Sequence, residues 1–394
     1  MRIKGEKMKK ISNVLFILFF ILSCAPTTTV KKYTEEELLE RRKEAEKYYS
    51  IGAEYYKQSE WEKALENFNT ALSYDSNYYE VYIAIGNTYR KLRDASKAEE
   101  YYLKALKIDN KNSKGYEALG DLYLSLNNLN KAESLYMKGI NLDTTNVELY
   151  LGLAEIYIKT NQDRKADSLY SLLITRCPER LDIFYKYGEF LTRRKRFKEA
   201  KSMFEKCLIR YSEELSLREK YGDILFELNE YDKAINEYNY ILSKNPNNVA
   251  IILKIGDVYL KQKKYKNALE MFNRALNLSP NDPMPHIHLA DYYQQTGNYS
   301  KAEEELRKAL AISPNLDVAF VIAGDIKRRR AEEAQKNKQL KDAYYLYKEA
   351  INNYNKVKED SPYFEYTRNE IKRIKIIMDK IKEELWFQGI KIEE

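Results

Sequence analysis

Few side chains in this sequence have the type and spacing that catalysis or metal binding requires. His286 and His288 are the two histidines; two residues apart on a helix, they point to different faces and cannot share a metal ion. Cys24, Cys177 and Cys207 include no Cys-x-x-Cys pair, the spacing of redox and zinc sites. The sequence contains no glycine-rich phosphate loop, nucleophile elbow or His-Glu-x-x-His motif. It therefore predicts no enzyme, no metal site, no cofactor and no small-molecule substrate.

The charge of the chain argues against a nucleic-acid partner. The sequence has 67 Lys and Arg residues against 60 Asp and Glu residues, which gives a formal net charge of +7. Residues 1–23 hold five basic residues and one Glu, so they contribute +4 and leave +3 for the rest. A balance this close to neutral creates no overall field that attracts a polyanion.

The amino-terminal segment has the pattern of an export signal. Basic residues within positions 1–10 precede an apolar run over residues 11–22. Twelve residues are too few to span a bilayer as a helix, but they suit the apolar core of a secretory signal. We therefore expect this segment to be removed after export.

The end of that segment, Ile21-Leu22-Ser23-Cys24, resembles the lipobox of bacterial lipoproteins. The resemblance implies a lipoprotein signal peptide over residues 1–23 and lipid chains on Cys24. It further implies a polar tether over residues 24–33 and a lipid-anchored protein of the bacterial cell envelope. No Asp follows Cys24, which favours the outer membrane, facing the periplasm. An ordinary signal peptide with an incidental cysteine is the alternative.

Most of the remaining chain repeats with a period of 34 residues, the distance in sequence from Gly52 to Gly86. Its lattice points are Gly52, Gly86, Gly120, Ala154, Gly188, Gly222, Gly256, Ala290 and Gly324. Twelve residues after each of the first eight stands an alanine, and four residues later a large apolar side chain. Such spacings place small and large residues on one helical face, and Pro178, Pro246, Pro280 and Pro314 follow in phase. The pattern predicts two helices per repeat.

This arrangement resembles the tetratricopeptide repeat, in which small residues allow paired helices to approach and aromatic residues fill the spaces between them. The resemblance implies an all-α protein, a right-handed α-solenoid of about nine helix hairpins over residues 34–358. Eight repeats follow without insertion: 45–78, 79–112, 113–146, 147–180, 181–214, 215–248, 249–282 and 283–316. Thr34 and Glu37 form a capping box that begins the first helix ahead of its repeat.

The last repeat departs from the pattern. Lys336 stands where an alanine is expected, and the matching set Ala343, Tyr347 and Ala350 comes seven residues late. Seven residues are two helical turns, so we expect a lengthened hairpin over residues 317–358. A helix over residues 361–387 then carries an apolar stripe, which suits it to cap the open end of a solenoid; residues 388–394 form a tail. The stripe consists of Ile371, Ile374, Ile377, Ile381 and Leu385.

Packing accounts for several residues that could otherwise suggest chemistry. His286 occupies a position held by Tyr or Phe in earlier repeats, and Cys207 a position of small packed residues. A disulfide between Cys177 and Cys207 stays open for an oxidising compartment. Six of the 36 tyrosines follow a lattice point by three residues, where they should pack between helices: Tyr55, Tyr89, Tyr123, Tyr157, Tyr259 and Tyr293.

In tetratricopeptide repeats the first helix of each hairpin lines a groove, and the residue after each lattice point faces it. Here these ladder residues are Asn87, Asp121, Glu155, Glu189, Asp223, Asp257, Asp291 and Asp325. A base stands one helical turn after Glu155, Glu189, Asp257 and Asp325, namely Lys159, Arg193, Lys261 and Arg329. Asp121, Asp223 and Asp291 have no such base. Glu219, Asp223 and Glu227 share one helix face, and we expect Phe226, Leu253 and Leu260 beside them.

These patterns predict a membrane-anchored scaffold that binds partner proteins with basic and apolar segments. The equivalents of the family's clamp for acidic chaperone tails are Tyr49, Ala53 and Ala84, so that ligand is disfavoured. One alternative is that the ladder acids are simply solvated. A second alternative is a peptidoglycan- or polysaccharide-associated component that uses tyrosines and residues Arg328 to Arg330 of the basic run Lys327 to Arg330. A third is a structural subunit of a secretion or pilus assembly machine.

Overall fold

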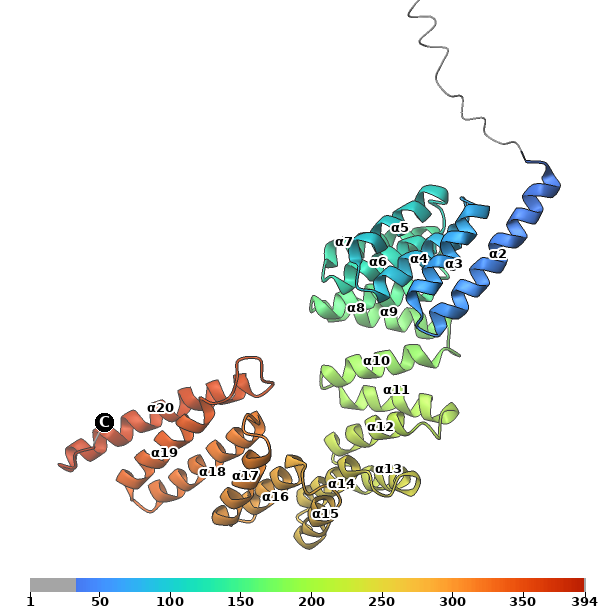
Figure 1. The fold of residues 1–394 in the computed structure, drawn as a ribbon. Coiled ribbons are helices and arrows are strands. Elements are labelled where there is room, and N and C mark those ends of the chain that lie inside the picture. Colours follow the sequence, from blue (N-terminus) through green and yellow to red (C-terminus); the bar gives the residue numbers. More distant parts are fainter. Residues whose placement is uncertain (1–32, 393–394) are drawn as a thin grey trace, which may run out of the picture. The chain divides into compact units, whose positions relative to one another are not determined.

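The computed structural model describes residues 33–392, which fold into helices joined by short turns and contain no strand (Figure 1). This confirms the predicted all-α class. The predicted signal peptide, Cys24 and nearly all of the predicted tether lie outside the described residues. The helices are α2 (Glu35–Lys57), α3 (Trp61–Tyr74), α4 (Tyr79–Lys91), α5 (Ala95–Ile108), α6 (Ser113–Ser125), α7 (Leu129–Leu142), α8 (Val147–Lys159), α9 (Asp163–Arg176), α10 (Leu181–Arg193), α11 (Phe197–Arg210), α12 (Leu215–Glu227), α13 (Tyr231–Lys244), α14 (Val249–Lys261), α15 (Tyr265–Leu278), α16 (Pro283–Gln295), α17 (Tyr299–Ile312), α18 (Asp317–Lys336), α19 (Leu340–Tyr354) and α20 (Phe364–Phe387).

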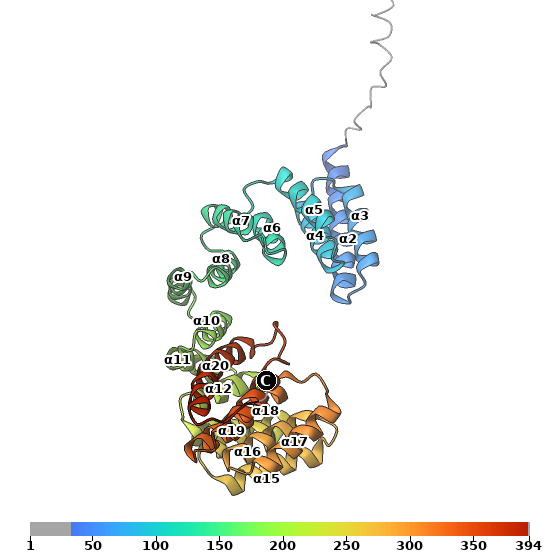
Figure 2. The ribbon, with the colours of Figure 1, turned by 90° about the vertical axis from the view of Figure 1, so that its left-hand side faces the viewer.

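Consecutive helices pack as antiparallel hairpins of the predicted α-solenoid. Between α4 and α17 the first helix of each hairpin has 13 residues and the second has 14. Two compact units divide the chain, residues 33–173 and residues 174–392, which Figures 1 and 2 show from two directions. Each unit buries its own core between successive hairpins.

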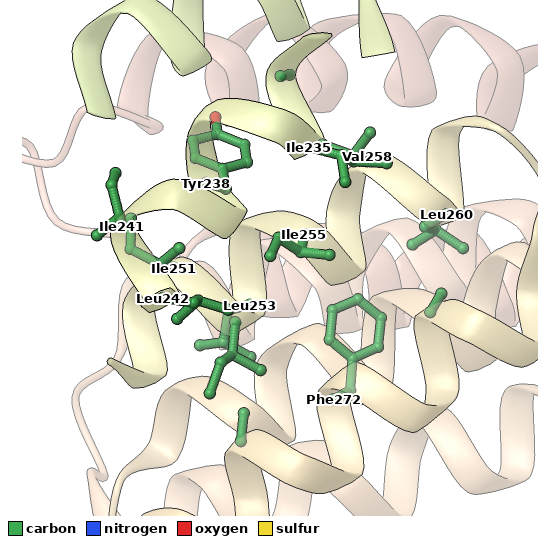
Figure 3. Packing of buried hydrophobic residues seen from close by; sticks show 14 of the residues in the cluster. Ile235, Tyr238, Ile241, Leu242, Ile251, Leu253, Ile255, Val258, Leu260 and Phe272 are labelled. Atoms are coloured by element: carbon green, nitrogen blue, oxygen red, sulfur yellow. The ribbon is translucent and has the colours of Figure 1, made fainter. Parts of the chain in front are cut away.

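The lattice glycines face aromatic rings of the second helix. A Cβ atom on Gly256 would lie 2.3 Å from Cε1 of Phe272, far inside van der Waals contact. Glycine therefore allows the ring to lie directly on the first helix at these positions. In the eighth repeat the lattice point is Ala290 and the residue sixteen later is Leu306, so a smaller side chain accompanies the added methyl group. Figure 3 shows the core of the sixth and seventh repeats, in which Tyr238 and Phe272 are the rings that face Gly222 and Gly256.

The turn inside most hairpins contains one residue with left-handed backbone, seven positions after the lattice point. Asn127, Asn161 and Asn229 fit this conformation, and Gly297 adopts it without strain. Lys195, with φ 58°, is among the residues that adopt it at a conformational cost. The same turn thus recurs with different residues, because the hairpin packing fixes its backbone.

The ninth hairpin is lengthened, as the sequence predicts. Helix α18 has 20 residues, and Gly324 meets the ring of Tyr354, thirty residues later instead of sixteen. Helix α18 is two turns, or seven residues, longer than the other first helices. The chain covers this added length once along α18 and again on its return along α19, so the ring that meets the glycine stands fourteen residues later than in the other repeats. Ala343, Tyr347 and Ala350 are buried in this hairpin.

Helix α20 covers the end of this last hairpin. Ile374, Ile381 and Leu385 are buried against α18 and α19, and Ile371 and Ile377 pack beside them. The predicted apolar stripe is therefore the face that α20 buries. At the other end of the described chain, Thr34 and Glu37 form the predicted capping box of α2.

Candidate functional site: a groove of paired charges

Several ladder residues accept hydrogen bonds from tyrosines of their own hairpins. Tyr136 donates its hydroxyl to Asp121 at 2.8 Å, and Tyr238 donates to Asp223 at 2.7 Å. The donor stands fifteen residues after the acceptor, on the second helix. Burial, followed by the charge of Asp223, raises the pKa of Tyr238, so the phenol stays protonated and donates.

A second set of partners comes from the following repeat. Their nitrogen atoms lie 2.7 to 2.8 Å from the ladder acids, and each base stands 31 positions after its acid. The pairs are Glu189 with Lys220, Asp223 with Lys254, and Asp257 with His288. Lys220, Lys254 and His288, with Lys186 before them, recur with the same period as the lattice glycines. This regular spacing was a signal in the sequence from which the pairs could have been predicted.

These contacts correct the expected distribution of charge. Asp223, which has no base one turn further along its own helix, shares the Lys254 ammonium group with Glu219, each at 2.7 Å. Asp121 lies 3.4 Å from a guanidinium nitrogen of Arg90. Intrahelical spacing alone could not show this, because both bases come from neighbouring hairpins.

The bases expected one turn on are used unevenly. Lys159 lies 3.5 Å from Glu155, as expected. Asp325 instead lies 3.9 Å from Arg328 and accepts hydrogen bonds from the hydroxyls of Tyr354 and Tyr366.

Two adjoining pockets lie over α10, α12 and α14 and share Asp223; we call them the groove pockets. Volumes of about 240 Å³ and 310 Å³ give each room for a large side chain. The first is lined by Glu189, Thr192, Arg193, Phe204, Lys220 and Asp223, and the second by Asp223, Phe226, Glu227, Tyr238, Lys254 and Asp257. Five of the predicted site residues therefore meet here.

The prediction that Leu253 and Leu260 line the groove surface is wrong. Leu253 is 5% exposed and Leu260 is 3% exposed, and both belong to the core of the second unit (Figure 3). They face inward because α14 is apolar on several sides and packs against α15 and α16. The apolar wall of the larger pocket is instead Phe226, which is only partly buried.

The remaining predicted site residues lie outside the groove pockets. Asp121 and Glu155 belong to α6 and α8 of the first unit, and Asp291 lies on α16. Glu219 reaches the site only through Lys254. The candidate site is thus confined to one part of the predicted ladder.

His288 is the titratable member of the series of bases. Burial by itself lowers its pKa, but the hydrogen bond and charge of Asp257 outweigh burial, with smaller effects of Asp291 and Asp282, so the pKa is raised above its usual value. Phe272 packs against the ring with centroids 5.6 Å apart. Lys261 contributes a fixed positive charge to the neighbouring Asp291.

We expect this pair to make stability depend on pH. Because the folded pKa of His288 is raised, its stabilising contribution is complete below the unfolded value of about 6.5 and is lost as pH rises through the folded value. Thermal unfolding between pH 5 and 9 should show the wild type losing stability over this interval, and His288→Lys should flatten that loss. An equal loss in both proteins would contradict the assignment.

His286 and Cys207 have the packing roles that were predicted. His286 is buried and its Nδ1 atom lies 2.6 Å from a carboxylate oxygen of Glu305. Cys207 is 1% exposed, and burial raises the pKa of its thiol to about 11. Both Cys177 and Cys207 are free thiols in the structure.

The basic run Lys327 to Arg330 is largely neutralised. Lys327 pairs with Glu303 and Glu349 at 3.1 and 2.8 Å, and Arg328 pairs with Glu332 at 2.6 Å. Arg330 also reaches Glu303. These partners come from α17, α18 and α19, so the sequence run alone overstated the free positive charge.

The tyrosines three residues after a lattice point have a lysine ammonium group over one face of the ring. Examples are Lys97 over Tyr89 at 4.9 Å and Lys131 over Tyr123 at 4.6 Å from the ring centroid. These contacts within a hairpin are of the cation–π kind. They cover a ring surface that stacking on a sugar or base would require.

Two further features bear on the class of site. Across residues 33–392, no group of three or more His, Cys, Asp or Glu side chains is arranged to hold a metal ion. None of the helices in that range combines the length and apolar character that crossing a bilayer requires.

The repeated hairpins and the groove on their first helices define an α-solenoid repeat protein. Models of the tetratricopeptide repeat match residues 79–112, 113–146 and 248–315, and a further model, described as TPR repeat, matches residues 52–92 and 222–263. Residues 52–146 and 222–315 of the chain thus consist of tetratricopeptide repeats.

Solved structures of similar fold share low sequence identity with this chain. A tetratricopeptide repeat protein from Parabacteroides merdae is 19% identical, with 62% of this chain and 96% of that chain covered and a TM-score of 0.46. PilW, a type IV pilus biogenesis factor, is 17% identical, with 51% and 94% covered and a TM-score of 0.46. The Pseudomonas aeruginosa protein pilF is 18% identical, with 52% and 94% covered and a TM-score of 0.40. A comparison with curated protein sequences gives no match.

Proposed function

We propose that this chain is a protein-interaction scaffold whose groove pockets bind a segment of a partner protein. The carrying observation is the pair of adjoining pockets that share Asp223. Grooves of this kind accept a peptide segment whose side chains enter successive pockets. Tetratricopeptide repeats are a scaffold for such interactions.

The chemistry of the larger pocket favours a segment that is both basic and apolar. Three carboxylates, those of Asp223, Glu227 and Asp257, line it together with the single ammonium group of Lys254. Glu227 is exposed, and Phe226 is only partly buried. Acidic groups steer a basic segment and set its register, and apolar contact supplies most of the affinity.

We further propose that the scaffold works in the bacterial cell envelope, tethered through lipid on Cys24 to the outer membrane. The lipobox resemblance of residues 21–24 supports this proposal. The polymer-binding alternative has less support, because the charges of Lys327, Arg328 and Arg330 are paired and many tyrosine rings are covered by a lysine.

Site-specific photocrosslinking in cells tests the groove. A crosslinker at Glu227 should capture a discrete partner, whereas one at exposed Asn239 of α13 serves as the matched control. Phe226→Ala should weaken capture at least about tenfold, equivalent to roughly 1.4 kcal/mol. Glu227→Gln should weaken capture and also flatten its salt dependence.

Variants of Glu219 and Asp223 are less suitable for this test. Their removal leaves Lys254 without its partners and adds a folding effect to any effect on binding. Undiminished capture by both the Phe226 and the Glu227 variants, at wild-type protein levels, would exclude the groove pockets. Another face, as a structural subunit of an assembly machine would use, would then be the better candidate.

A further inference from the structure

Three successive ladder acids of the second unit obtain a base from the next repeat. Glu189, Asp223 and Asp257 each pair with the residue 31 positions later, at 2.7 to 2.8 Å. Asp223 also accepts the hydroxyl of Tyr238, fifteen positions later. A ladder acid in this unit therefore has two places at which its own chain can supply a partner, although the earlier place holds Phe204 for Glu189 and Phe272 for Asp257.

Asp291 has an apolar residue at both of these places. Leu306 stands where Tyr238 stands for Asp223, and Ile322 stands where Lys254 stands. Both side chains are packed in the core between α16, α17 and α18. Within residues 33–392, the hydrogen bond that Asp291 accepts comes from the neutral amide of Gln295, at 2.8 Å, and no lysine or arginine reaches ion-pair distance.

The surroundings of Asp291 make this lack of a cation costly. Burial raises the pKa of Asp291, and the charge of Asp257 adds to that effect, whereas Lys261 and His288 oppose it only partly. The Nδ1 atom of His288 is already hydrogen-bonded to Asp257. A carboxylate in such a place gains from any cation that reaches it.

A second observation lies on the same helix face. Gln294, three residues after Asp291, is 4% exposed, and its Nε2 atom is buried without a hydrogen-bond partner in the described chain. Residues three apart on a helix are neighbours on its surface. The helix thus holds a carboxylate without a cation beside a buried amide donor without an acceptor.

We infer that Asp291 is the position at which a lysine or arginine side chain of the bound partner enters the groove. The partner's cation would take the place that Lys220 and Lys254 hold for the preceding acids. This inference rests on the proposed function and specifies the register of its ligand. A metal ion is a poorer occupant, because no three suitable ligands gather among the described residues.

The spacing of the helices gives the register. Neighbouring first helices lie roughly 10 Å apart, so Asp291 lies about 20 Å from Asp223. An extended segment advances about 3.3 Å per residue, so its basic residue should stand about six positions from the side chain that contacts Phe226.

To test this inference, dodecapeptides that bind the full-length protein are selected from a displayed random library. Selected peptides are synthesised with lysine and with N-acetyl-lysine at the enriched basic position, since acetylation removes the charge and keeps the length. Their affinities are measured for the wild type, for Asp291→Asn, and for Ile322→Lys with Ile322→Met as its matched control. Ile322→Lys supplies within the chain the base that other repeats have.

We expect the lysine peptides to lose at least tenfold in affinity on acetylation, on Asp291→Asn and on Ile322→Lys, but not on Ile322→Met. Carbon NMR should show the pKa of Asp291 falling when peptide binds, and falling without peptide in Ile322→Lys. If Ile322→Lys does not fold, Asp291→Asn and the acetylated peptides decide the outcome.

Two contrary results are distinguishable. Peptides that require Phe226 but ignore the Asp291 and Ile322 variants would overturn this inference and leave the proposed function intact. If no peptide is selected, or if binding ignores Phe226→Ala as well, the proposed function fails and the inference fails with it.

Discussion

Phe272→Ala should lower the free energy of unfolding of its part of the solenoid by about 3–5 kcal/mol, the usual cost of truncating a fully buried phenylalanine. Phe272 is 0% exposed, and its ring lies on Gly256, against α14 and α16 (Figure 3). Alanine would leave a cavity between three helices. Thermal unfolding and hydrogen exchange of α14 and α15 measure the effect, which should be much smaller in the first unit.

A double-mutant cycle controls this experiment. Gly256→Ala forces a methyl group against the ring and should cost about 1–3 kcal/mol. In the background of Phe272→Leu the same change should cost clearly less, because the eighth repeat already combines Ala290 with Leu306. Costs that simply add would show that glycine and ring do not interact as described.

Cys24→Ala should abolish lipid attachment and release the protein from washed membranes. The physical reason is that several acyl chains hold a protein on a bilayer far more durably than one, and without Cys24 none can be attached. Metabolic labelling with a radioactive fatty acid and fractionation of cells provide the two measurements. Both signals should fall to background.

The control is Cys177→Ala, which removes a different cysteine and should leave labelling unchanged. If the Cys24 variant is still labelled and still sediments with washed membranes, residues 1–23 are not a lipoprotein signal. If the wild-type protein is not labelled with fatty acid and is released from washed membranes, residues 1–23 are an ordinary signal peptide.

The fold was predictable because packing at short range repeats along the chain. Gly256 and Ala268 mark one helix crossing, and the same crossing recurs in each repeat, so one correct interpretation applies to every hairpin. The lengthened ninth hairpin followed from a seven-residue delay of Ala343, Tyr347 and Ala350. Small and large residues on one helix face were thus enough to place the helices.

The candidate site was only half predictable. The ladder acids were recognised from their position beside the glycines, but their partners were not, since Lys254 and His288 come from the neighbouring hairpin. Intrahelical spacing favoured pairs such as Glu155 with Lys159, the weaker kind of contact here. Leu253 and Leu260 were misplaced because α14 is apolar on more than one face, so the sequence pattern did not show which side is buried.

The constant offset between each acid and its base makes one repeat an exchangeable unit. A gene rearrangement that removed residues 215–248 would put Lys254 at the sequence offset from Glu189 that Lys220 has now. Insertion of a whole repeat would likewise supply one new acid and one new base. Losses of other lengths would break every such pair across the junction. Recombination can therefore lengthen or shorten the binding surface by whole repeats while the joints between hairpins stay the same.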